Sequence, residues 1–127
     1  MKKYYIGEKN IKNYTPHDVV LYDFGKPVIS FPSCGVARCQ TTREKVSEIV
    51  LISGTTESDI RLCTIDINST QFGQVEGLPE PDGETFYIVS LAVAQAMSGK
   101  RSDLLVTDDT VRDENGKIVG CRAFARV

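Results

Sequence analysis

The chain has 127 residues, of which 41% are apolar and 25% charged, and these values suit one domain with a single core. Its net charge of −2 excludes a broadly basic protein that binds DNA by neutralising phosphates. No stretch is long and apolar enough for a membrane helix. The basic start Met1–Lys3 has no apolar run behind it, so we expect no secretory signal and a cytoplasmic location.

The first two thirds of the chain predict β-structure punctuated by turns. The Thr15-Pro16 step favours a turn rather than a helix. Runs of β-forming residues separated by glycine and polar residues follow it. The expected strands are Asp18–Tyr22, its hairpin partner Pro27–Phe31 across the turn Asp23–Lys26, an extended Val36–Cys39, and the runs Val46–Ile52 and Ile60–Ile67, with 68–76 able to pair once more.

The last third predicts a strand, a helix and a hairpin. An acidic, proline-rich loop, Gly77–Gly83, precedes a strand at Phe86–Val89. Ser90 is suited to cap a helix over 91–98, and Gly99 is suited to end it. Asn115-Gly116 predicts a hairpin between residues near 110 and 118. The expected fold class is therefore α+β, a β-rich single domain (1–127) with antiparallel hairpins and one helix.

The register of this last hairpin decides where Arg112 points. A two-residue loop pairs Arg112 with Val119 and turns it to the apolar face, whereas a three-residue loop with a bulge at Gly116 pairs it with Ile118. The second register places Arg112 on the face of Arg122. The sequence leaves both open.

Alternation along 118–127 gives the final strand two different faces. One is small and apolar, and the other carries Arg122, Phe124 and Arg126 beside Gly120. Two guanidiniums flanking an aromatic ring suit a planar anion such as a nucleotide. A solvated outer face is the alternative.

Groups that could perform catalysis are few. His17, the single histidine, is interpreted as stabilising the turn beside Pro16 rather than as a general base. The adjacent Asp108 and Asp109 lie in a turn-forming context. The four cysteines lack the close paired spacing of a zinc site and are expected to be reduced thiols. We therefore expect no enzyme, no metal site and no cofactor.

Three further residues are candidates for a ligand site. Alternation places Arg61 with Cys63, Ile65 and Ile67, either in a paired role or at the exposed end of a strand. Phe86 opens a strand and Met97 closes the helix after it, so both could line one groove. The alternative for Phe86 and Met97 is that they belong to the core.

Four segments together resemble a family of small phage and prophage proteins, and within it the first described type of Thoeris anti-defence protein. They are Asn13–Val19, Gly73–Pro81, Thr85–Ser90 and Asp108–Arg122. That type is a sponge, which binds a cyclic ADP-ribose signal and withholds it from the host's effector. The resemblance implies a homo-oligomer, from dimer to hexamer, in the host bacterial cytoplasm. It also implies glycocyclic ADP-ribose ligands and, for some relatives, cyclic di- or trinucleotides.

The resemblance also implies roles for particular residues. Phe86 would stack on adenine, Met97 would pack beside it, and Arg112 would hold phosphate or base, with Arg61 and Arg126 matched by spacing. Nanomolar binding requires about −12 kcal/mol. A stacked base at about 1–3 kcal/mol and charge-assisted bonds at about 1.5–3 kcal/mol each could supply this in a closed site. The competing hypotheses are a phosphodiesterase or lyase acting on such signals and a phage structural or interaction module.

Overall fold

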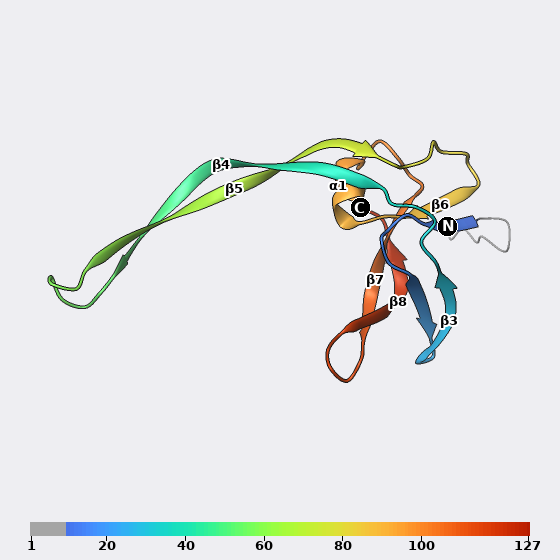
Figure 1. Cartoon of the computed structure of the whole chain (residues 1–127), viewed down its shortest axis with the longest axis horizontal. Coiled ribbons are helices and arrows are strands. Elements are labelled where there is room, and N and C mark those ends of the chain that lie inside the picture. Colours follow the sequence, from blue (N-terminus) through green and yellow to red (C-terminus); the bar gives the residue numbers. More distant parts are fainter. Residues whose placement is uncertain (1–9) are drawn as a thin grey trace, which may run out of the picture. The chain divides into compact units, whose positions relative to one another are not determined.

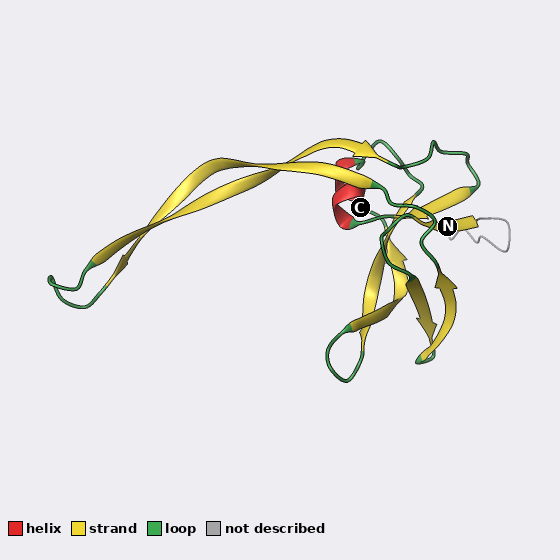
Figure 2. Ribbon diagram, viewed as in Figure 1, coloured by secondary structure: helices red, strands yellow, loops and turns green. Residues whose placement is uncertain are grey.

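The computed structural model describes residues 10–127 and is rich in strands with one short helix (Figures 1 and 2). The strands are β1 Asn10–Asn13, β2 Val19–Asp23, β3 Lys26–Phe31, β4 Arg38–Ser53, β5 Arg61–Glu76, β6 Thr85–Ile88, β7 Leu104–Arg112 and β8 Ile118–Ala125, and the helix is α1 Leu91–Ala96. The predicted fold class is confirmed. Met1–Lys3, on which the expectation of no secretory signal rests, lies outside these residues.

The chain divides into two compact units. The body comprises the residues up to Cys39 and those from Gln74 onward, and the hairpin unit is Gln40–Gly73. The body holds a six-stranded sheet in the order β1-β6-β7-β8-β2-β3, whereas β4 and β5 form a separate two-stranded sheet. The runs predicted at Val46–Ile52 and Ile60–Ile67 are thus parts of two strands of 16 residues each.

The body sheet mixes parallel and antiparallel pairings. β6 pairs in parallel with β1 and β7, and β8 pairs in parallel with β2. The predicted β2–β3 hairpin is antiparallel, with Phe24 and Gly25 both at positive φ (51° and 74°) in its turn. That conformation is typical of a type I′ turn, whose twist matches that of the strands it joins.

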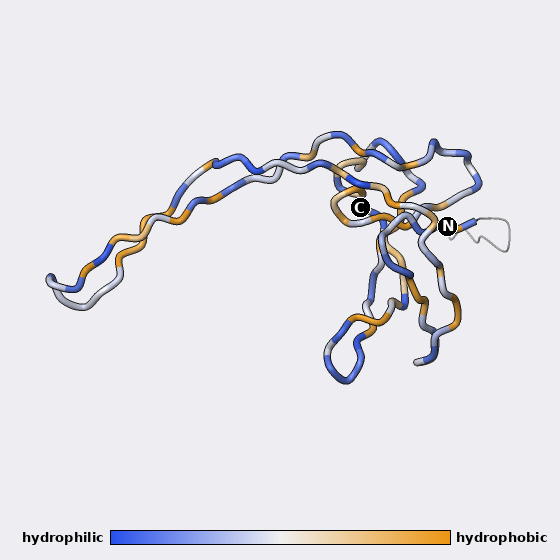
Figure 3. The backbone as a smooth tube through the Cα atoms, in the orientation of Figure 1, coloured by the Kyte–Doolittle hydropathy of each residue, from blue (hydrophilic) through white to orange (hydrophobic). Residues whose placement is uncertain are grey.

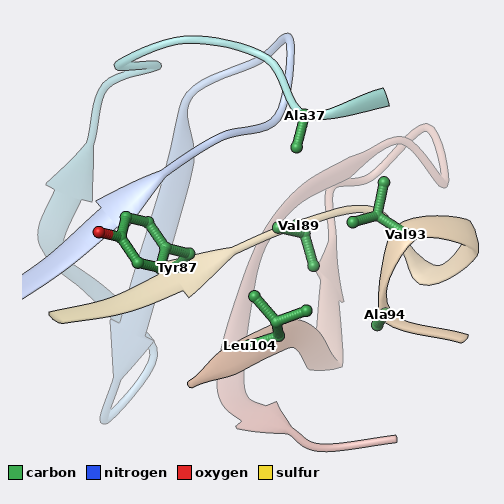
Figure 4. Close-up of a cluster of buried hydrophobic side chains, with 6 residues drawn as sticks. All are labelled: Ala37, Tyr87, Val89, Val93, Ala94 and Leu104. Carbon is green, nitrogen blue, oxygen red and sulfur yellow. The ribbon is translucent and has the colours of Figure 1, made fainter. Parts of the chain in front are cut away.

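The core of the body lies where α1 packs beside β6 and β7. Its buried members come from the end of the first segment, β6, α1 and β7, and Figure 4 shows them: Ala37, Tyr87, Val89, Val93, Ala94 and Leu104. Ser90 caps α1 as predicted, because its side chain accepts a hydrogen bond from the backbone N–H of Val93. The helix ends at Ala96, two residues before the predicted end, and Gly99 follows with a φ of 78°.

The β7–β8 hairpin has the second of the two predicted registers. Arg112 pairs with Ile118, and the N–H of Gly116 donates to the carbonyl of Asp113, with a φ of 79° at Gly116. The register shifts between Val111 and Arg112. A bulge of this kind interrupts the alternation of side chains between the two faces of a strand. The strict alternation therefore does not extend to the turn of the β7–β8 hairpin.

Candidate functional site

The body contains a cleft with a volume of about 710 Å³ at the starting ends of β2 and β8. Four separate stretches of chain line it: residues 15 and 17–20, residues 89–91, residues 106–107 and residues 117–121. β2 and β8 pair at Leu21 and Cys121, and Cys121 itself belongs to the lining. The volume lies within the range of about 300–1,000 Å³ that is usual for small-molecule sites.

The cleft has apolar walls and a polar rim. Val19, Val89, Leu91, Val106 and Ile118 provide aliphatic side chains, of which Leu91 is 54% and Ile118 51% exposed. Exposed aliphatic surface in a concave site favours a flat, apolar ligand face.

The polar rim of the cleft carries few charges. It holds Ser90 and Thr107 as hydroxyls, His17 as an imidazole, and Lys117 and Asp18 as charges of opposite sign. Within residues 10–127, Lys117 and Asp18 take part in no ion pair. Lys117 is thus the cation that the cleft offers to an anionic ligand.

Asn13 builds the side of the cleft that holds His17. This fully buried side chain donates from Nδ2 to the carbonyls of His17 (2.7 Å) and Phe31 (2.9 Å). Its Oδ1 accepts from the backbone N–H of Thr15 (2.9 Å) and from the Thr15 hydroxyl (2.6 Å). A buried amide with all its partners satisfied fixes local geometry strongly. The predicted turn at Thr15-Pro16 is therefore held by Asn13 rather than by the His17 side chain.

Gly120 allows β2 to lie close to β8. A Cβ atom at this position would come within 2.5 Å of the Val20 carbonyl oxygen and of the Tyr22 ring. Real Cβ atoms do not approach backbone so closely, so only glycine fits here. Because Val20 and Gly120 both line the cleft, this approach sets its width.

Lys117 is held through its backbone by the hairpin turn. The Asp113 carboxylate accepts from the backbone N–H groups of Asn115 (2.9 Å) and Lys117 (3.0 Å), and the Lys117 carbonyl accepts from the Asp113 N–H (2.9 Å). This network makes Asx-type turn contacts around Gly116. It orders the backbone that presents the lysine at the cleft rim.

Two of the predicted site residues, Phe86 and Arg126, lie in contact. The guanidinium of Arg126 is 5.8 Å from the centre of the Phe86 ring, within the range of a cation–π interaction. The hollow beside Arg126 has a volume of about 40 Å³, near the space of one water molecule. Phe86 and Arg126 therefore offer a surface for stacking, not an enclosing pocket.

Arg122 and Arg112 each have local partners. Arg122 forms an ion pair with Asp109 at 3.2 Å, with both side chains half exposed. Arg112 donates to the carbonyl of Gly116 at 2.7 Å, across its own hairpin turn. Both guanidiniums remain accessible, and each would exchange or share its present contact on binding an anion.

Met97 and Arg61 are found in two other settings. Met97 is the C-cap residue of α1 and packs against the core cluster, as the core alternative expected. Arg61 opens β5 in the hairpin unit and is exposed.

Sequence reasoning missed Lys117 as a site residue and did not assign His17 to a ligand cleft. Both line the cleft. The signals were present, because Asn13 to His17 and Asn115 to Lys117 are turn sequences, but nothing local indicates that the two turns border one space.

A second ion pair stabilises the body near the end of α1. Arg101 donates from Nε and Nη2 to the two carboxylate oxygens of Asp103 at 2.8 and 2.7 Å, and it lies 5.9 Å from the centre of the Tyr87 ring. These hydrogen bonds hold the pKa of Asp103 below its ordinary value. Burial raises the pKa of the Cys121 thiol, so this cleft-lining cysteine is a poor nucleophile.

Comparisons with known proteins identify no relative. No protein-family model matches the chain, and no curated protein or solved structure is significantly similar to it. Within the described chain, no group of three or more His, Cys, Asp and Glu side chains could hold a metal ion. None of the helices among residues 10–127 is long and apolar enough to cross a membrane.

Proposed function

We propose that this protein binds a small anionic, nucleotide-like signal and sequesters it without cleaving it. The observation that carries the proposal is the cleft of about 710 Å³, with aliphatic walls and Lys117 at its rim. The aliphatic side chains can cover the face of a planar base, while the ammonium group of Lys117 can neutralise part of a phosphate charge.

The resemblance to Thoeris anti-defence proteins supplies the class of ligand. Under this proposal the ligand is a cyclic ADP-ribose isomer, with cyclic di- and trinucleotides as the second class to be screened. The protein would act in the cytoplasm of an infected bacterium, as an assembly of several copies. Sequestration needs affinity and slow release, which aliphatic walls and the Lys117 ammonium group can supply.

A thermal-shift screen tests binding. A ligand at one hundred times its dissociation constant adds about 2.7 kcal/mol to the stability of the folded state. For 127 residues this corresponds to a rise of about 10 °C in melting temperature, from an unfolding entropy of about 2.1 cal/mol/K per residue. The screen uses cyclic ADP-ribose isomers and cyclic oligonucleotides. No shift with any of them would reject the proposal and favour a phage structural or interaction module.

Two variants locate the bound ligand. Lys117→Glu reverses the charge at the cleft rim, whereas Phe86→Ala removes the ring that Arg126 contacts. If the cleft holds the ligand, the first variant abolishes the shift and the second retains it. The opposite result would place the ligand at the Phe86–Arg126 surface, which the sequence predicted.

His17 favours one alternative function, because it lines the same cleft as Lys117. An imidazole can accept or donate a proton and could assist hydrolysis or elimination of a bound signal. Mass spectrometry of ligand released by heat separates the two functions. Intact ligand supports sequestration, while a linear or cleaved product whose formation stops in His17→Ala would establish an enzyme.

A further inference from the structure

The ligand cleft contains a carboxylate that an anion site alone does not need. Asp18 and Lys117 are the two acidic and basic side chains of its described lining, with His17 as a further polar group. Their charges cancel, so the pair offers no net attraction to a bare anion. A carboxylate repels a nearby phosphate, and the repulsion grows where water is excluded. The place of Asp18 therefore indicates a ligand that carries a hydrogen-bond donor as well as a phosphate.

Asp18 and Lys117 occupy similar places on two neighbouring strands. Asp18 directly precedes β2 and Lys117 directly precedes β8, and these strands pair in parallel at Leu21 and Cys121. Because the pairing is parallel, the starts of both strands lie at the same end of the sheet. Both charged residues therefore stand at one rim of the cleft, each at the start of its own strand.

In both strands the charged residue is followed by aliphatic residues that also line the cleft. The two sequences are Asp18-Val19-Val20 and Lys117-Ile118-Val119. Figure 3 shows this change along the β7–β8 hairpin, where hydrophilic colour at the turn gives way to hydrophobic colour as β8 begins. The lining thus passes from charge to aliphatic surface along each strand. A nucleotide has the same order of groups, from phosphate and sugar to the flat face of its base.

The Asp18 carboxylate is accessible, and the backbone beside it is anchored. Asp18 is exposed, and among residues 10–127 it takes part in no ion pair. The carbonyl of the preceding residue, His17, accepts a hydrogen bond from Nδ2 of the buried Asn13 at 2.7 Å. An anchored backbone reduces the conformational entropy that is lost when a ligand binds. Asp18 is therefore open to a ligand at low entropic cost.

The chemistry of Asp18 selects the kind of group that it can bind. An ionised carboxylate only accepts hydrogen bonds, so its partner must be a donor. A nucleotide has two kinds of donor, the hydroxyl groups of its ribose and the amino group of its base. The ribose joins the base to the phosphate, so a nucleotide with its phosphate at Lys117 keeps its sugar near the same rim. A carboxylate that accepts from a ribose hydroxyl is also a recurrent feature of dinucleotide-binding sites.

We propose that Asp18 makes this cleft selective for ribonucleotides by accepting a hydrogen bond from a sugar hydroxyl while Lys117 binds the phosphate. The inference rests on the proposed function, because it assigns a role within the same cleft. It adds a requirement that sequestration alone does not contain, namely a free hydroxyl on the sugar. A ligand without that hydroxyl leaves Asp18 facing a phosphate that it repels, so selectivity has an attractive and a repulsive part.

Titration of the full chain, followed by nuclear magnetic resonance, tests this selectivity with two probes, adenosine 5′-monophosphate and its 2′,3′-dideoxy analogue. The wild type is expected to bind the ribonucleotide at least about 10-fold more tightly, as expected for a hydrogen bond to a charged group. Asp18→Ala should reduce this preference to less than about twofold, mainly by weakening ribonucleotide binding. Lys117→Met should weaken both probes alike, because both carry the phosphate.

Two further variants are the controls. Asp23→Ala removes a carboxylate at the other end of β2, outside the cleft lining, and should keep the full preference. Asp18→Asn keeps an acceptor oxygen without the charge and should keep part of it. Equal affinities for the two probes, a preference that survives Asp18→Ala, or no binding of the ribonucleotide would overturn the inference. Equal affinities beside a thermal shift with a cyclic ADP-ribose isomer would reject the role of Asp18 alone, whereas no binding of any nucleotide would also reject sequestration.

Discussion

Replacing Asn13 by Ala should destabilise the protein strongly, although Asn13 lies outside the cleft lining. The substitution removes four hydrogen bonds, to the His17 and Phe31 carbonyls and to the N–H and hydroxyl of Thr15. Each contributes about 1 kcal/mol net, and some of the freed groups regain water. We therefore expect a loss of about 3 kcal/mol, or about 11 °C in melting temperature for a chain of this length.

Urea unfolding of a double-mutant cycle measures this prediction. Thr15→Val removes the hydroxyl that donates a hydrogen bond to Asn13. Because both substitutions remove this same bond, the double variant should lose about 1 kcal/mol less stability than the sum of the two single variants. The single change at Asn13 should also reduce ligand binding, because the loop that presents His17 loses its anchor. A loss below about 1 kcal/mol, or full additivity, would refute the role given to Asn13.

Three further changes test other parts of the structure. Gly120→Ala should cost about 1–3 kcal/mol in urea unfolding, because its Cβ collides with β2; an unchanged midpoint would mean that β2 does not lie so close. Ser90→Ala should cost about 1 kcal/mol by removing the cap of α1, whereas Ser98→Ala, beyond the helix end, should cost little. The wild type should lose stability as the pH falls below about 4, because Asp103 has a lower pKa folded than unfolded and its contribution vanishes on protonation. Asp103→Asn should reduce the loss of stability at acid pH. The same loss in the variant would contradict the attribution of this loss to Asp103.

Local patterns predicted most of the secondary structure. Gly25 and Gly116 mark their turns because glycine tolerates positive φ, and Ser90 marks the start of α1 by its side-chain chemistry. Phe24 also adopts a positive φ, which a bulky side chain disfavours. The full length of β4 and β5 was harder to predict. Residues 38–45 and 68–76 are mainly polar, so they lack the alternating apolar pattern that marks a strand. Backbone hydrogen bonds hold them together instead.

The cleft could not be predicted from local sequence because it is assembled from four distant stretches. Periodicity indicates which face of a strand a residue occupies, but it does not say which other strand lies opposite. The pairing of β2 with β8 joins residues about one hundred positions apart, and that pairing brings His17 and Lys117 to one rim.

Arginine positions illustrate a different limit of sequence reasoning. Alternation along 118–127 placed Arg122 and Arg126 on the same face of a strand. Whether each guanidinium is free to bind a ligand depends instead on its contacts with other residues. Arg122 pairs with Asp109, a residue in the left-handed region at a φ of 49°, and Arg126 lies over the Phe86 ring. Neither partnership follows from spacing, because each joins residues that lie far apart in the sequence.

Isothermal titration with cyclic ADP-ribose isomers tests the central claim most directly. The account predicts that at least one isomer binds the wild type in the nanomolar to low micromolar range and is released chemically intact. Lys117→Glu should lose that binding at least 100-fold, while Lys26→Glu, an equal charge change on β3 away from the cleft lining, should keep it. An affinity that Lys117→Glu leaves unchanged would contradict the account. So would a sustained heat signal from turnover, accompanied by a cleaved product.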